Sequence, residues 1–232
     1  MELHRYISFE SFVDIVQSKS LKFVYPPVAW EDTYEGYAYR AMQTLSGRER
    51  IFSILISRGV DKDHAGLFLN DGLLSTLRYQ CWSKAKDKVA MWSIYSYSSK
   101  ALMISTKSEE LEKLTINGRR NVQLMPVNYV QSLSLEDELT ALTPTTFTSN
   151  LIFQSKRNEF SHEEEIRAYI DTNGILNKQL PLSVPIKNVQ EFIGGVLVHP
   201  NSPTWYVDVV QEYCKANGIN FLGQSRLYKF EM

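Results

Sequence analysis

Apolar residues recur at helical spacing in two long stretches of the chain. Residues 9–19 follow Ser8, a residue type that caps helix N-termini, and present an apolar residue on each turn. Residues 202–218 place Pro203 near the start and Gly218 at the end, which predicts a second long helix. The predicted buried stripe of this helix consists of Trp205, Val209, Val210 and Tyr213.

Polar and apolar residues alternate along 163–170 instead. Ile166, Ala168 and Ile170 fill the even positions, so this stretch predicts a strand that is buried on one face only. Shorter apolar stretches predict further strands at 3–7, 21–27, 100–106, 121–130 and 225–230.

Helical patterns dominate residues 37–80, whereas helices and strands alternate irregularly in the remainder of the chain. Neither an internal repeat nor a clear linker divides the sequence. We therefore expect a single α+β domain over residues 1–232, with a mixed or antiparallel sheet split around a cleft and a helical insert near 37–80.

Composition excludes several classes of protein. A net charge of −1 argues against nonspecific binding to nucleic acid, and the two cysteines and four histidines lack the spacing of a disulfide framework or a zinc site. No apolar stretch has transmembrane length, and the N-terminal residues do not resemble a signal peptide. We expect a cytoplasmic protein that does not associate with membranes.

Three glutamates crowd the start of the alternating stretch, although like charges at close range repel. On a strand, Glu163 and Glu165 would share one face with Arg167, while Glu164 would point to the apolar side. This pattern needs no functional explanation if the strand edge is solvated and one carboxylate pairs with Arg167 or a nearby lysine. Paired carboxylates also suit general-base chemistry or stabilisation of a cationic sugar.

Aromatic and polar residues cluster twice within 14 residues, first at Trp82 and Ser83 and then at Trp92 and Tyr95. Core packing explains part of this cluster. An aromatic slot for a planar ligand ring is the alternative.

Arg5 lies in a predicted strand, where a charged side chain either faces solvent on an edge or meets an anion. The acidic residues of 30–36 lack the pattern of a calcium loop, so an ordinary acidic loop is preferred over a metal site there. We therefore assign no residue to a metal.

These stretches together resemble a bacterial domain of unknown function, the family numbered 2971. The motifs that carry the resemblance are "HRY" (4–6), "WEDTYEG" (30–36), "CWS" (81–83), "MWSIY" (91–95), "EEEIR" (163–167) and "SRL" (225–227). His4 departs from the tyrosine usual in that family, and "WEDTYEG" departs from its Asn-Asp-Pro turn. The family name implies no function.

The order of the motifs also resembles that of ADP-ribosyltransferases, including those that modify DNA and RNA. This resemblance implies NAD as a substrate that loses nicotinamide through a cationic ribose. It implies that Glu165 stabilises this cation and that Glu163 orients or deprotonates the acceptor. The residues implied for binding NAD are Arg5, His4, Ser83, Trp92 and Tyr95.

The resemblance predicts an NAD-consuming enzyme that modifies a nucleic acid or a protein in bacterial defence or as a toxin, with an inhibitory partner protein. One alternative is a module without catalytic activity that binds a nucleotide or a protein. Another is a nuclease-like enzyme that holds Mg²⁺ through Glu31, Asp32, Glu163 and Glu165.

Overall fold

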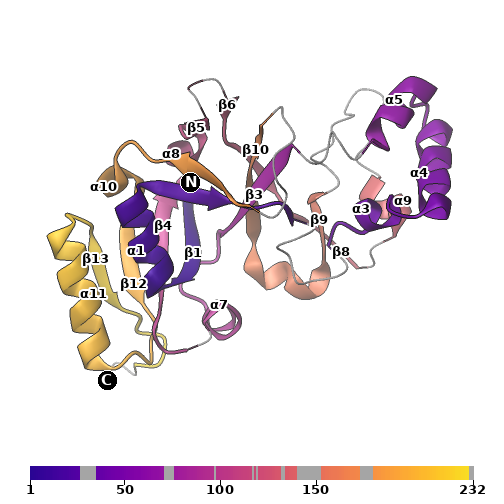
Figure 1. The fold of residues 1–232 in the computed structure, drawn as a ribbon. Helices are drawn as coiled ribbons and strands as arrows, with labels where there is room; N and C mark the ends of the chain where they lie inside the picture. Colours follow the sequence, from indigo (N-terminus) through magenta and orange to yellow (C-terminus); the bar gives the residue numbers. More distant parts are fainter. Residues whose placement is uncertain are drawn as a thin grey trace.

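The fold is known from a computed structural model, shown in Figure 1. It describes the chain except for residues 27–34, 71–75, 97, 117, 119, 132–133, 140–152, 173–179 and 230–232. Within the described part, none of the helices has both the length and the hydrophobicity needed to cross a membrane.

The described helices and strands alternate irregularly, as the sequence predicts. The helices are α1 (Phe9–Ser18), α3 (Tyr37–Ala41), α4 (Leu45–Ser57), α5 (Lys62–Phe68), α7 (Val89–Tyr95), α8 (Ser108–Glu112), α9 (Leu135–Glu138), α10 (Val189–Phe192), α11 (Thr204–Ala216) and the 3-10 helix η3 (Asn158–Glu163). The main sheet contains β1 (Glu2–Ser8), β3 (Leu77–Ser83), β4 (Ala101–Lys107), β7 (Gln123–Pro126), β10 (Glu165–Asp171), β12 (Gly195–Val198) and β13 (Phe221–Gln224). Three small sheets pair β2 (Ser20–Phe23) with β11 (Leu182–Pro185), β5 (Thr115–Ile116) with β6 (Arg120–Asn121), and β8 (Asn128–Val130) with β9 (Ser155–Arg157).

The seven-stranded sheet has the order β13-β12-β4-β1-β3-β10-β7 and is mixed, because β12 and β13 are parallel while the other neighbours are antiparallel. The α+β class and the mixed sheet expected from the sequence are confirmed.

The sheet forks at its centre. β1 pairs with β4 over seven residues, and β3 pairs with β10 over seven residues, yet β1 and β3 meet in register at the His4–Ser83 pair alone. Beyond that pair Tyr79 of β3 bridges to Val24, which directly follows β2. The half of the sheet that contains β1 and β4 therefore separates from the half that contains β3 and β10. The gap between them, called here the fork, contains the candidate site.

Apolar cores lie on both sides of the fork, and the larger one spans both halves of the sheet, because it also contains Trp82 of β3 and Ile166 of β10. The larger core joins β1, β4 and β12 to α1 and α11, and includes Leu3, Phe12 and Val210. A second core packs α3, α4 and α5 against Tyr79 of β3. In Figure 1 these groups of helices lie at opposite ends of the molecule, with β3 and β10 between them.

The helical insert ends earlier than predicted, because Leu77–Ser83 form β3 rather than a helix. Leu77, Tyr79 and Cys81 alternate there with Arg78 and Gln80, but this short pattern follows directly on a long helical one, and both sets of side chains are largely buried.

The predicted stripe of the C-terminal helix is right for Val210 and Tyr213, which belong to or pack against the larger core, and wrong for Trp205 and Val209. In α11 Tyr206, Val210 and Cys214 are buried, whereas Trp205 is 56% exposed and Val209 is 46% exposed. The predicted strand at 225–230 is wrong over 225–229, which contain a turn, while residue 230 lies outside the described residues.

The glutamate stretch differs from the predicted strand as well. Glu163 ends η3, Glu164 has a left-handed φ of 46°, and β10 begins only at Glu165. Both faces of β10 are buried, so its alternation separates an apolar core from a buried polar site rather than a core from solvent.

Candidate functional site

A pocket of about 470 Å³ lies at the fork, within the size range of small-molecule sites. Residues of β1, β3, α7, η3 and the start of β10 line it. Six of the seven side chains predicted for the site line it, namely His4, Arg5, Ser83, Tyr95, Glu163 and Glu165. The fork thus brings together residues that are up to 161 positions apart in the sequence.

Arg5 supplies a positive charge to the pocket. Strand alternation directs it away from the face of His4, but the separation of β1 from β3 opens the pocket to both. Burial lowers the pKa of Arg5, while the nearby Cys81 raises it. Among the described residues Arg5 forms no ion pair, and its half-buried side chain lines the pocket, where a guanidinium can bind an anion.

Glu165 lies on the other side of the pocket, held by Arg167. The guanidinium Nε donates to Glu165 Oε1 at 2.9 Å, and Nη2 donates to Oε2 at 3.3 Å. Burial alone would raise the pKa of Glu165, but Arg167 and Lys156 lower it to about 2. Glu165 is therefore a fixed negative charge at neutral pH.

Glu163 reaches the same pocket from the end of η3. The hydroxyl of Ser83 donates to the main-chain oxygen of Glu163 and accepts a hydrogen bond from Ala85 N at 2.8 Å. The resemblance implies that Ser83 binds NAD, and in the structure its hydroxyl also fixes the backbone that carries Glu163.

Lys156, from β9, joins the acidic side chains. Its Nζ lies 3.0 Å from Glu35, 2.5 Å from Glu163 and 3.2 Å from Glu165. Burial raises the pKa of Glu35, although Arg167 and Lys156 act in the opposite sense. The five side chains Glu35, Lys156, Glu163, Glu165 and Arg167 form one buried network, called here the charge cluster.

Tyr95 is the exposed ring of the pocket, at 39% exposure on the last turn of α7. Burial of its hydroxyl and the neighbouring Glu163 carboxylate both raise its pKa, so the phenol stays protonated. An accessible aromatic face beside carboxylates can stack on a planar ligand ring.

Trp92 lies outside the pocket lining. Its ring packs edge-to-face against Tyr6 at 4.8 Å, and its Nε1 donates to Asp87 at 2.8 Å. The tryptophan supports the pocket wall from behind through Tyr6, which does line the pocket.

His4 is almost fully buried, and its Nδ1 lies 2.9 Å from Ser105 Oγ. Burial lowers its pKa, so the imidazole is neutral at pH 7. Its other ring nitrogen, Nε2, lies 3.8 Å from Glu2, so both nitrogens of the neutral ring face polar side chains of the chain itself.

The charge cluster is a poor metal site, because Lys156 and Arg167 already neutralise most of its carboxylate charge. No group of three histidine, cysteine, aspartate or glutamate side chains suited to a metal occurs in the described part of the chain. Trp30, Glu31 and Asp32 of the acidic loop lie outside the described residues.

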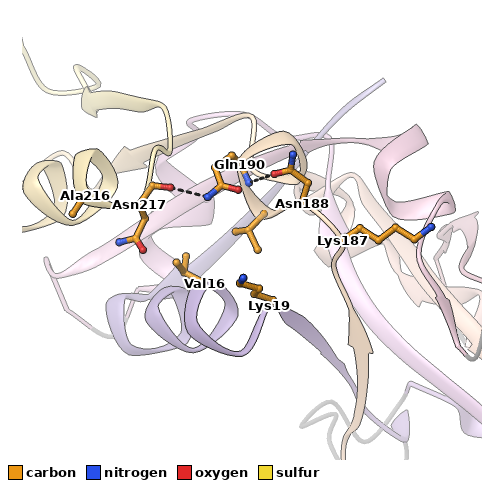
Figure 2. Close-up of a pocket in the computed structure, with 8 residues that line it drawn as sticks. Val16, Lys19, Lys187, Asn188, Gln190, Ala216 and Asn217 are labelled. Carbon is orange, nitrogen blue, oxygen red and sulfur yellow. Dashed lines mark hydrogen bonds between the residues drawn. The ribbon is translucent and has the colours of Figure 1, made fainter.

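Figure 2 shows a second pocket, of about 630 Å³, between the C-terminal ends of α1 and α11 and the start of α10. Gln190 Nε2 donates to Asn217 O there at 3.0 Å, and Lys19 and Lys187 are its charged lining residues. This lining offers amides and lysines but no carboxylate or thiol, so the fork pocket is the stronger candidate for chemistry.

Sequence reasoning missed Lys156 and gave Glu35 no place beside Glu163 and Glu165. "QSKR" (154–157) carries no periodic or motif signal, and Lys156 meets its partners only through tertiary folding. Cys81, also in the lining, pairs across the sheet with Arg167, but this register cannot be read from the sequence before the strands are known.

No family model matches the chain and no curated protein matches it, so membership in the family numbered 2971 is not confirmed. Two solved structures are similar to the chain. They are Thermus sp. 2.9 DarT in complex with NAD+ (TM-score 0.41, 9% identity, 95% of this chain and 93% of that chain) and Thermus sp. 2.9 DarT in complex with ADP-ribosylated ssDNA (TM-score 0.41, 8% identity, 95% and 92%).

Proposed function

We propose that the chain is an NAD-consuming enzyme of the ADP-ribosyltransferase-like class. The observation that carries this proposal is the composition of the fork pocket. One strand contributes Arg5, which has no ion pair in the described structure, and the opposite side contributes the ionised Glu165 with Glu163 beside it.

A pocket that contains both a cationic and an anionic side chain suits NAD. The pyrophosphate of NAD is anionic, and a planar guanidinium such as that of Arg5 binds phosphate oxygens through paired hydrogen bonds. The ribose next to nicotinamide gains positive charge as its bond to nicotinamide breaks, so a fixed carboxylate such as Glu165 stabilises the transition state. The ring of Tyr95 is available to stack on nicotinamide.

In the proposed step, the bond between ribose C1′ and the nicotinamide nitrogen breaks, and nicotinamide leaves with the electron pair. An oxygen or nitrogen of the acceptor forms the new bond to C1′ and gives up its proton. Glu163 accepts this proton, for which its position beside Tyr95 and Glu165 is suited. Ser83 keeps Glu163 in place by holding its backbone oxygen.

The acceptor in this proposal is a nucleic acid or a protein. A role in bacterial defence or as a toxin, with an inhibitory partner protein, belongs to the same proposal and rests on the family resemblance alone.

Two measurements on the purified chain test the proposal. Nicotinamide release from NAD is followed with single-stranded DNA, RNA or a protein mixture as acceptor, and we expect release with at least one of them. Melting is followed with NAD, with Mg²⁺ and with an oligonucleotide, and we expect NAD to raise the melting temperature while Mg²⁺ alone does not. Stabilisation by Mg²⁺ without NAD would favour the nuclease-like alternative.

One observation favours a binding module without catalysis. Both carboxylate oxygens of Glu165 already accept hydrogen bonds from Arg167, and Lys156 contacts one of them. A carboxylate saturated in this way is also what a purely structural ion pair needs. NAD that stabilises the chain but is never cleaved, with any of the three acceptors, would decide for the binding module.

A further inference from the structure

Lys156 has an unusual set of partners for a buried lysine. Its ammonium contacts carboxylates from three places in the fold, which are Glu35 before α3, Glu163 at the end of η3 and Glu165 at the start of β10. The side chain is only 8% exposed, and its Nζ lies 4.8 Å from the ring centre of Phe160.

Burying an ammonium costs free energy unless partners compensate it. Here three carboxylates meet two cations, Lys156 and Arg167, so the formal charge of the cluster is one negative. Arg167 contacts Glu35 and Glu165, whereas Glu163 meets its described ion-pair partner in Lys156 alone. Lys156 is therefore the cation that ties Glu163 to the rest of the cluster.

We propose that Lys156 is a positioning residue of the fork pocket, which holds Glu163 beside Glu165 through its ion pairs with both carboxylates. This inference rests on the proposed function, because it assigns Lys156 to the NAD-consuming site. Lys156 does not touch the reacting atoms in this role and acts through the two glutamates.

The other groups that face Lys156 do not replace it. Tyr95 from α7 and Tyr129 from β8 are phenols whose pKa burial raises, so they carry no charge at neutral pH. Arg167 is fixed by Glu35, Glu165 and the main-chain oxygen of Phe153.

Replacing Lys156 by methionine tests this role. Lys156→Met removes the charge and keeps an unbranched apolar side chain, which leaves two excess negative charges in the cluster. The carboxylates then bind protons more readily, and we expect the acid limb of the pH profile of nicotinamide release to move upward by about 1–3 pH units. Lys156→Arg keeps the charge and should leave the acid limb near its wild-type position.

Two further variants separate charge from folding. Lys156→Met combined with Glu35→Gln removes one charge of each sign, so it restores the original excess and should return the acid limb toward that of the wild type. Lys88→Met is the matched control, since Lys88 is an exposed lysine paired with Glu164 and should leave the pH profile unchanged.

A titration without NAD distinguishes this inference from the proposed function. In protein with ¹³C-labelled glutamate carboxyl groups, NMR should show the pKa of Glu165 rising from about 2 in the wild type to a higher value in Lys156→Met. If the wild type releases no nicotinamide, the proposed function fails while this titration still decides the role of Lys156. An unchanged Glu165 titration, or Lys156→Met that is faster than the wild type with an unmoved acid limb, would overturn the inference.

Discussion

Single residues in the fork pocket differ in how their charges are satisfied. Arg5 has no ion pair in the described structure, whereas Glu165 has two cationic partners. Arg5 is therefore the group that can bind a ligand, whereas Glu165 is already held in place by the fold. Arg5 was identified from the sequence because a charged residue in a strand needs an explanation, whereas the ion pairs of Glu165 depend on which strands become neighbours.

Removing the Arg5 charge should weaken the binding of NAD. A hydrogen bond to a charged group contributes about 1.5–3 kcal/mol, so Arg5→Gln should raise the Kd for NAD by about 10- to 100-fold. Isothermal titration calorimetry measures this change. Arg48→Gln, at an exposed arginine of α4, serves as the control and should bind like the wild type. Equal affinity in Arg5→Gln and the wild type would remove Arg5 from the site.

The low pKa of Glu165 makes the stability of the fold depend on pH. Its pKa is about 2 in the folded chain against an ordinary 4.5, so its contribution is present above pH 4.5 and is lost as the pH falls toward 2. That contribution is on the order of 3 kcal/mol at neutral pH. Glu35, whose pKa is raised by burial, acts in the opposite sense and offsets part of it.

Urea unfolding at a series of pH values measures this effect. The free energy of unfolding of the wild type should fall between pH 4.5 and pH 2. Glu165→Gln should be less stable at pH 7 and should lose much of this acid dependence, while Glu164→Gln should keep it because Glu164 is exposed. A wild-type slope that persists in Glu165→Gln would contradict the assigned charge state.

At the scale of elements, local signals predicted α1, β1 and β4 well. Ser8 caps α1 as expected, accepting a hydrogen bond from Ser11 N at 3.2 Å. The alternation of the glutamate stretch predicts a strand with one face in solvent, but it is equally compatible with a strand whose polar face is buried against other charges, as in β10. No sequence pattern indicates that Glu164 turns the chain, because a left-handed φ at a glutamate is uncommon.

The helix α11 gives a direct stability test of the corrected packing. Val210 is fully buried, so Val210→Ala should reduce the free energy of unfolding by about 2–3 kcal/mol through lost burial and a cavity. Trp205 is 56% exposed and packs on Lys100 and Tyr206, so Trp205→Ala should cost less than about 1 kcal/mol. Chemical denaturation of both variants checks the order, and a larger loss for Trp205→Ala would restore the stripe predicted from the sequence.

At the scale of the whole molecule, the fork determines where the chemistry can occur. Two well-paired halves of one sheet separate after the His4–Ser83 pair, and the gap collects side chains from β1, β3, α7, η3 and β10. The motifs predicted residues that mostly line the fork pocket, including Glu163 and Glu165, but not the ion pairs that join these two glutamates to Lys156 and Glu35 in the charge cluster. Its ion pairs join Glu35 to Lys156 and Arg167 over more than 100 residues, a separation that local patterns do not encode.

Nicotinamide release by Glu163→Gln and Glu164→Gln, measured beside the wild type, tests the central claim most directly. Glu163 is buried in the fork pocket, whereas its neighbour Glu164 is exposed and pairs with Lys88. We predict that Glu163→Gln lowers the rate by about 10²–10³ at an unchanged fold, as judged by its melting curve, while Glu164→Gln keeps the wild-type rate. Equal rates in both variants, or a loss in Glu163→Gln that follows its unfolding, would contradict the assignment of the fork pocket as an NAD-consuming site.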